Sequence, residues 1–284
     1  MVRTVAETAK VGRVGDLALD YVREGGRTVL TRSHCSSPWH VTPPIQLDDS
    51  PCLYTPLVNP SGGLVGGDRL SVRTTIGPDA HVLFSTPSAN RIYRSLGETA
   101  VQSIELNVGS GAILEWMPDV TIPYAGSRFK QTINVSLASG ATVLFWDAIA
   151  SGRIARGERW IFTSLENEIR VVTASGRSVL ERYALAPADH GVGQAESWDY
   201  VGSLYLIGDG VYAGRWKELE SKLATILDAR PGSVLGGVSE PAAPGLAVKL
   251  VAKSAPDLNE TLNDLWQAVR LVLWNLPRPA LRRY

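Results

Sequence analysis

The segment of this chain that most resembles a chemical site is rich in glycine: it runs Asn59, Pro60, Ser61, Gly62, Gly63, Leu64, Val65, Gly66, Gly67, Asp68. Gly62 and Gly67 are spaced as in a phosphate-binding loop, which continues with a lysine and a serine or threonine and opens a helix. Asp68 and Arg69 stand in those places, and an alternating strand pattern follows. Because an aspartate would repel phosphate, the segment does not predict a nucleotide site.

Glycines provide freedom for positive φ and for the close approach of another backbone. We therefore expect a tight double turn at residues 59–68. Such a turn could present the Asp68 carboxylate to a partner surface or to an internal channel.

Four residues near the N-terminus offer atoms that bind metals: His34, Cys35, His40 and Cys52. Imidazole and thiolate groups suit zinc or nickel. Their spacing matches no closed metal site and includes no Cys-x-x-Cys pair, so ordinary loop residues are the better interpretation.

No set of residues typical of an active site stands out. None of the serines near glycines lies in a Gly-x-Ser-x-Gly turn. Asp189 and His190 are adjacent in sequence, which favours a solvated loop over a catalytic triad. Glu115 and Asp119 could act together on a glycosidic bond, but a carboxylate at a strand end is usually solvated or paired with arginine. We predict a protein that is not an enzyme.

Arginines occur in groups along the chain: Arg91 with Arg94, Arg153 with Arg156, and Arg278 with Arg282 and Arg283. Since acids elsewhere balance them, they favour ion-paired contacts with protein over a surface for nucleic acid.

The elements that must position these residues are mostly strands. Apolar alternation around Gly25-Gly26 predicts a hairpin over residues 17–32. Residues 72–84, 104–116 and 133–145 share one pattern, and their matching alanines, Ala80, Ala112 and Ala141, lie 32 and 29 residues apart. This period predicts stacked strand-turn-strand units, with a sandwich of similar hairpins as the alternative. A weaker fourth turn lies at residues 174–176.

The last third has helical spacing. Trp216 to Ile226 predicts a helix that stops at Pro231-Gly232, and Leu246 to Val251 predicts a buried strand. Ser254 predicts the cap of a second helix, which Pro277 ends. The sequence thus predicts a mainly β fold, a β-helix-like stack with a small helical flank near the C-terminus. We expect one domain over residues 1–284, strand-rich in 1–207 and mixed in 208–284.

Composition excludes several classes of partner. The chain has 284 residues, with Lys plus Arg and Asp plus Glu at 28 each and a pI near 6.9, so no basic field attracts nucleic acid. No apolar run approaches the roughly 20 residues that span a bilayer. Residues 1–20 lack the pattern of a signal peptide. We expect a cytoplasmic protein that binds neither nucleic acid nor membrane.

Residues 59–70 resemble the hallmark of the urease accessory protein D family, UreD, also called UreH. Further blocks resemble that family in the same order along the chain: residues 86–95, 114–119, 152–158, 181–182 and 270–278. The sequence departs from the family pattern at Asn90-Arg91, where Thr-Lys is usual, and at residues 122–124.

This resemblance implies a β-helix-like stack and a role in placing nickel in apo-urease. It implies the accessory protein UreF, the GTPase UreG and apo-urease as partners, with a homodimer inside the complex and GTP hydrolysis left to UreG. It implies no tightly bound cofactor and at most a transiently held nickel ion, for which Asp68, Glu115 and Glu158 are the candidate ligands. The alternative is a non-catalytic strand stack for binding or oligomerisation.

Overall fold

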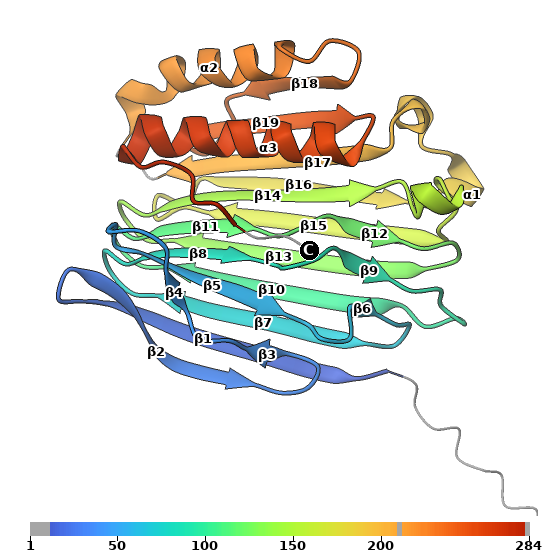
Figure 1. Ribbon diagram of the computed structural model, residues 1–284, viewed down its shortest axis with the longest axis horizontal. Coiled ribbons are helices and arrows are strands. Elements are labelled where there is room, and N and C mark those ends of the chain that lie inside the picture. Colours follow the sequence, from blue (N-terminus) through green and yellow to red (C-terminus); the bar gives the residue numbers. More distant parts are fainter. Residues whose placement is uncertain (1–11, 209–211, 282–284) are drawn as a thin grey trace, which may run out of the picture.

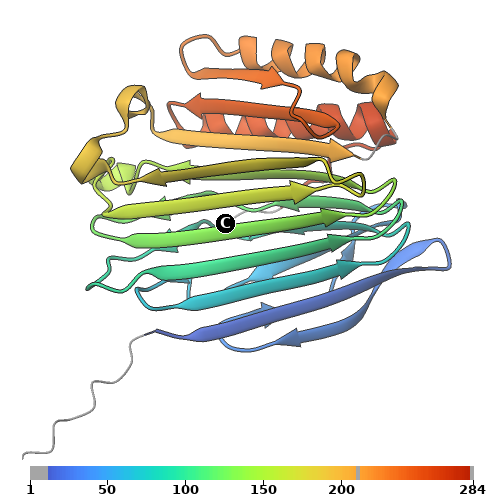
Figure 2. The ribbon, with the colours of Figure 1, turned by 180° about the vertical axis from the view of Figure 1, so that it is seen from behind.

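Two β-sheets face each other, and two helices cover the outer side of one of them (Figure 1; Figure 2). The computed structural model describes residues 12–208 and 212–281. Among these residues no helix has the length and apolar character needed to cross a membrane. The mainly β fold with a helical flank is confirmed.

The first sheet has seven strands in the order β16-β15-β13-β10-β7-β1-β2. Their bounds are β1 Val14–Glu24, β2 Arg27–Cys35, β7 Arg69–Ile76, β10 Ala100–Val108, β13 Arg128–Leu137, β15 Ser164–Val172 and β16 Ser178–Leu185.

The second sheet has twelve strands, and its main order is β18-β19-β17-β14-β11-β8-β5-β3. The main strands are β3 His40–Val41, β5 Cys52–Val58, β8 His81–Ser85, β11 Ile113–Met117, β14 Thr142–Ala150, β17 Tyr200–Gly208, β18 Val234–Ser239 and β19 Gly245–Ala252. Four short strands lie beside them: β4 Ile45–Gln46, β6 Gly63–Leu64, β9 Asn90–Ile92 and β12 Thr121–Pro123.

Parallel pairing in register builds a β-solenoid, as the repeat predicted. Val72, Ile104 and Ile133 lie side by side on β7, β10 and β13. After each of these strands the chain crosses to the second sheet, where β8, β11 and β14 are likewise parallel neighbours. The matching alanines immediately precede these return strands and are fully buried at the corners of the solenoid.

The solenoid ends where parallel pairing stops. β15 continues the stack beside β13, but the turn after it reverses the chain into the antiparallel strand β16. The predicted turn at residues 174–176 therefore closes a hairpin and does not begin another coil. The hairpin predicted over residues 17–32 is confirmed by antiparallel β1 and β2.

Two apolar layers hold the molecule together. Alternate residues of both sheets meet in one core, and the outer side of β14, β17 and β19 meets the helices in a second. The central strand β14 is buried along its whole length because it belongs to both layers. The boundary proposed at residue 207, and the count of one domain, stay predictions.

The helices are α1 Pro187–His190, α2 Trp216–Asp228 and α3 Ala255–Val269, with short 3-10 turns η1 Ile154–Arg156, η2 Gly193–Ser197 and η3 Ala213–Arg215. The Ser254 hydroxyl accepts the Asp257 N–H at 3.2 Å, which confirms the predicted cap. Beyond α3 the chain continues as a π-helical turn, η4 Arg270–Trp274, which the sequence did not predict.

Candidate functional site

The glycine-rich segment folds as two tight turns, as its glycines predicted. The Gly62 N–H donates to the Asn59 carbonyl at 3.0 Å, and the Asp68 N–H donates to the Val65 carbonyl at 3.1 Å. Gly62 and Gly67 have φ values of 71° and 90°, a region that favours glycine. The segment is therefore a rigid double turn.

This double turn packs closely against β9. Gly63 pairs with Arg91, and a Cβ added to Gly63 would lie 2.0 Å from the Arg91 carbonyl oxygen. The Asn59 side chain closes the first turn, since its Oδ1 accepts from the Ser61 N–H at 3.1 Å and from the Ser61 hydroxyl at 2.6 Å. Close backbone packing therefore explains the glycine at position 63, and closure of the first turn explains the asparagine at position 59.

The Asp68 carboxylate points into the turn and is 4% exposed. Its Oδ2 accepts the Val65 N–H at 2.9 Å, and its Oδ1 accepts the Arg13 N–H at 2.8 Å. Asp68 thus ties the loop to the chain just before β1. Its proposed contact with nickel stays a prediction.

Glu158 follows η1 and is held by Arg153. Its Oε2 accepts from Arg153 Nε at 2.8 Å and from the Ala125 N–H at 3.1 Å. The hydrogen bond from Arg153 holds the pKa of Glu158 below its ordinary value. Its role on a nickel path also stays a prediction.

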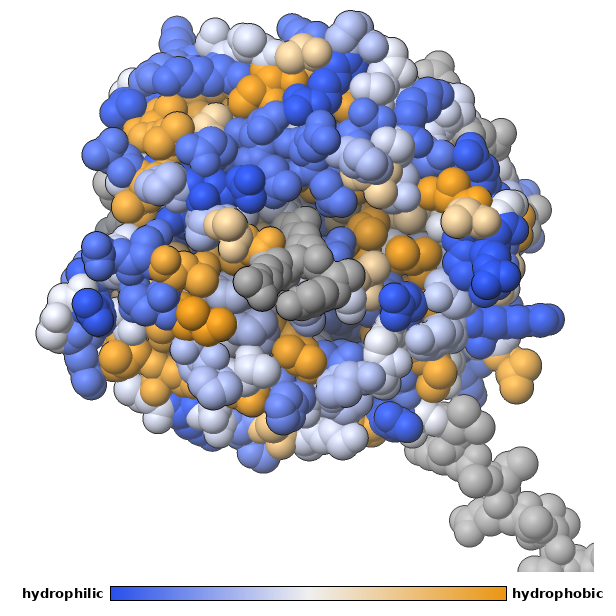
Figure 3. Space-filling view, in the orientation of Figure 1, coloured by the Kyte–Doolittle hydropathy of each residue, from blue (hydrophilic) through white to orange (hydrophobic). Residues whose placement is uncertain are grey.

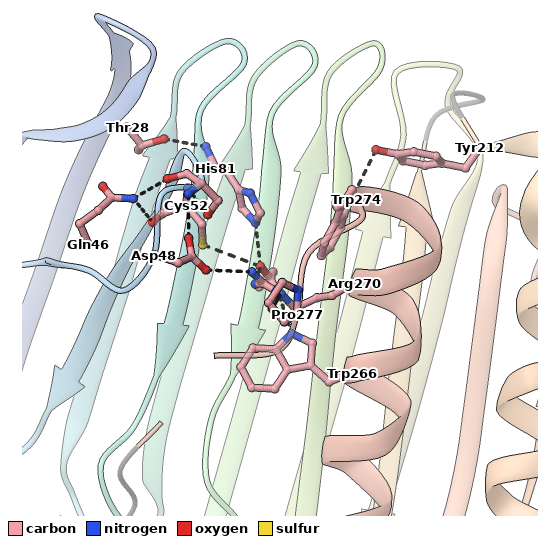
Figure 4. Close-up of polar contacts among 12 residues, drawn as sticks. Thr28, Gln46, Asp48, Cys52, His81, Tyr212, Trp266, Arg270, Trp274 and Pro277 are labelled. Carbon is pink, nitrogen blue, oxygen red and sulfur yellow. Dashed lines mark hydrogen bonds and ion pairs between the residues drawn. The ribbon is translucent and has the colours of Figure 1, made fainter. Parts of the chain in front are cut away.

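Glu115 belongs to a buried polar cluster, of which Figure 4 labels Cys52, His81, Trp266 and Arg270. Its Oε1 lies 2.7 Å from His81 Nε2 and also accepts from the Arg270 guanidinium. Its Oε2 accepts from Trp266 Nε1 at 2.5 Å, and the Cys52 thiol lies 3.8 Å from Oε1. The Glu115 and Arg270 side chains are both fully buried.

The solenoid and the C-terminal helix bring this cluster together. Cys52 and His81 are paired residues at the starts of β5 and β8, and Glu115 lies on the next strand, β11. Trp266 comes from the last turn of α3 and Arg270 from η4. Five residues spread over the whole chain therefore meet at one point.

Burial and the neighbouring charges together set the protonation states of Glu115 and Cys52. Burial alone would raise the pKa of Glu115, but the hydrogen bond and charge of His81 and the charge of Arg270 bring it below its ordinary value. Glu115 is therefore ionised. Burial, reinforced by the Glu115 charge, raises the pKa of the Cys52 thiol well above its ordinary value, so the thiol keeps its proton.

These side chains could hold a metal ion only in competition with Arg270. Ligand atoms of Cys52, His81 and Glu115 lie within 4.8 Å of one another, and this donor set suits nickel or zinc. The Arg270 guanidinium already neutralises the Glu115 carboxylate, and a metal would also have to displace the Cys52 proton. The arrangement is thus a buried ion pair, and a metal cation that competed with Arg270 for Glu115 would bind only weakly.

Of the four residues near the N-terminus with metal-binding atoms, only Cys52 joins this cluster. His34, Cys35 and His40 are exposed, whereas Cys52 is 5% exposed. Across residues 12–208 and 212–281, the group of Cys52, His81 and Glu115 is the one set of three such ligands within metal-binding distance. His81 carried a sequence signal: it occupies the register position at which Ile113 and Thr142 stand in the later repeats.

A second polar cluster lies between the two sheets and was not predicted. Asp147 on β14 accepts from Gln131 at 3.1 Å and from Asn167 at 2.7 Å. Gln102, Gln131 and Asn167 occupy the same register position on β10, β13 and β15. Burial raises the pKa of Asp147. Gln102, Gln131 and Asp147 line a cavity of about 70 Å³ together with Asn59, Gly62 and Gly63 of the double turn.

Comparison with known proteins covers nearly the whole chain. The family model described as UreD urease accessory protein matches residues 13–283. A urease accessory protein UreD from Deinococcus radiodurans is 34% identical over 278 residues, which are 95% of this chain and 95% of that protein. The proteins of the same name from Herpetosiphon aurantiacus and Cupriavidus necator are 31% and 29% identical, over 93% and 94% of this chain and 95% and 92% of their own lengths.

Gly63→Ala should destabilise the protein because the new methyl group would collide with the Arg91 carbonyl. We expect a loss of about 1–3 kcal/mol in the free energy of unfolding, measured in urea. Gly237→Ala on β18 is the control, since nothing lies within 4 Å of its added Cβ. Equal unfolding midpoints for the two variants would contradict the packing argument.

Glu115→Gln should lower the free energy of unfolding by about 3–5 kcal/mol because it removes the closest counter-charge of the buried Arg270 and leaves Asp48, whose carboxylate lies 4.0 Å away. Glu158→Gln, in the partly exposed pair with Arg153, is the control and should cost about 1 kcal/mol or less. Since the folded state lowers the pKa of Glu115, this stabilisation is present above the ordinary value of 4.5 and is lost as the pH falls below it.

Urea unfolding across this pH range would therefore show a smaller pH dependence for Glu115→Gln than for the unchanged chain. The double variant Glu115→Gln with Arg270→Met should recover part of the loss. If the free-energy losses of the two single substitutions simply added in the double variant, the two side chains would not stabilise each other.

Proposed function

The chain belongs to the UreD family of urease accessory proteins, and we propose on this basis that it is a non-enzymatic chaperone or scaffold that assembles the nickel centre of apo-urease. The observation that carries this proposal is the family match over residues 13–283. A buried ionic cluster on the solenoid that contains three metal-binding side chains supports it.

We propose UreF, the GTPase UreG and apo-urease as partners, and a homodimer of this chain within their complex. GTP hydrolysis falls to UreG in this scheme. The double turn at residues 59–68 supports that division, since Asp68 occupies with its carboxylate the backbone N–H groups that a phosphate would need. A cytoplasmic location, and the absence of a tightly bound cofactor, belong to the same proposal.

Nickel is cargo in this proposal. Of the three proposed ligands Asp68, Glu115 and Glu158, Glu115 has the strongest support because a thiol and an imidazole lie beside it. A nickel ion would bind Glu115 when the Arg270 guanidinium moves aside. Arg270 belongs to a π-helical turn, a structure frequent at functional sites. Competition with a fixed cation would keep binding weak, as release to urease requires.

Deletion of the gene in its host should abolish urease activity even when nickel is supplied, and return of this chain should restore it. The measurement is urease activity in cell extracts. Normal activity after deletion would contradict the proposal. So would restoration by this chain in a strain without the GTPase, and self-association without binding to urease or its accessory proteins would favour the oligomerisation alternative.

Cys52→Ala should reduce the nickel bound by the isolated chain, measured by equilibrium dialysis, and the yield of active urease. Cys35→Ala is the matched control because that thiol is exposed and lies outside the cluster. We expect about tenfold weaker nickel binding for Cys52→Ala, as loss of one of three ligands would produce. The control variant should bind nickel as tightly as the unchanged chain. Equal nickel binding by both variants would exclude the cluster as the nickel site.

A further inference from the structure

The fold brings together two arginine pairs that lie 62 residues apart in the sequence. The surface that they form is here called the arginine surface: Arg91, Arg94, Arg153 and Arg156. Parallel pairing of β9 with β12 places Arg91 beside Ile122. The Arg153 guanidinium lies 4.3 Å from the centre of the Tyr124 ring, and Tyr124 meets Tyr93 edge to face at 5.3 Å.

A surface groove of about 420 Å³ runs through this region. Arg94 and Arg153 line it together with Tyr124, Gly126 and Glu158. Gly126 lies beside Arg94, since an added Cβ would lie at an ordinary contact distance of 3.4 Å from Arg94 Cγ. The groove is therefore lined by two arginines, one tyrosine ring and one carboxylate.

Positive charge is in excess here, although the whole chain is neutral. Arg153 is paired with Glu158. Within the described residues Arg91, Arg94 and Arg156 have no carboxylate within 4.0 Å. The neighbouring Arg159 is already paired with Asp199 at 2.8 Å. The single carboxylate of Glu158 thus interacts with both Arg153 and Arg156, whereas Arg91 and Arg94 keep no carboxylate partner among the described residues. Arg94 and Arg156 are exposed.

The double turn borders this surface. A Cβ added to Gly62 would lie 3.1 Å from Arg91 Nη1 and 3.6 Å from the Tyr93 hydroxyl. The Arg91 guanidinium thus lies directly against the backbone of the double turn. On the face shown in Figure 3, hydrophobic residues form several groups among hydrophilic ones.

We propose that the arginine surface binds an acidic, carboxylate-rich segment of a partner protein. Guanidinium groups bind carboxylates through paired hydrogen bonds, and the two tyrosine hydroxyls can donate to the same segment. Opposite charges across an interface also raise the rate and specificity of association. The balanced charge of the chain favours a protein partner over nucleic acid, which needs a wide basic field.

The double variant Arg94→Glu with Arg156→Glu tests this proposal. Purified apo-urease, UreF and UreG serve as the probes, a choice that rests on the proposed function. One of them should bind about tenfold more weakly to the double variant than to the unchanged chain. The control is Arg73→Glu with Arg177→Glu, two exposed arginines on β7 and in the turn before β16. Equal thermal unfolding of both variants would show that folding is intact.

Carbodiimide cross-linking tests the chemistry of the contact. In Arg94→Lys the new amine should form an amide with a carboxylate of the bound partner, and mass spectrometry would locate it in an acidic segment. Arg73→Lys should give no such product.

Unchanged binding by the double variant, with no cross-link in Arg94→Lys, would overturn this inference and leave the proposed function standing. Absence of binding by all three proteins would overturn both. Displacement of the partner by a single-stranded oligonucleotide that binds the unchanged chain but not the double variant would assign the surface to nucleic acid and overturn the inference.

Discussion

The buried ion pair of Glu115 and Arg270 fixes how the C-terminal helix lies on the solenoid. Both side chains are excluded from water, so each charge depends on the other, with Asp48 at 4.0 Å as a more distant second carboxylate for Arg270. Trp266 donates to the second oxygen of the same carboxylate, and His81 contacts the first. Apolar packing alone would allow α3 to slide along the sheet, whereas these directed contacts select one position.

The same interaction joins stability to the proposed handling of nickel. The carboxylate that stabilises the fold is the one that lies beside a thiol and an imidazole. A cation can use it only at the expense of Arg270, and the raised pKa of the Cys52 thiol adds a second cost. In the proposed function, such a site would take up a nickel ion weakly and release it to urease.

Parallel stacking supplies the frame for everything else. Because β7, β10 and β13 stand in register, equivalent residues form rows through the molecule. One such row places Gln102 beside Gln131 and Asn167, opposite Asp147. At the strand ends the same stacking brings β9 beside β12 and so collects the arginine surface. Stacking of the coils thus brings residues that are far apart in sequence together, both along the rows of equivalent residues and at the ends of the strands.

The sequence by itself determined the repeat, the hairpin, the two helices and the double turn, because periodicity, caps and glycine act over short distances. The family followed from short blocks read in order. Only the tertiary structure decided that His81 meets Cys52 and Glu115, and that Arg270 closes the group, since strand pairing and helix docking set those contacts. It also turned Asp68 inward and gathered Arg91, Arg94, Arg153 and Arg156 on one surface, because the direction of a side chain depends on neighbours that sequence spacing does not reveal.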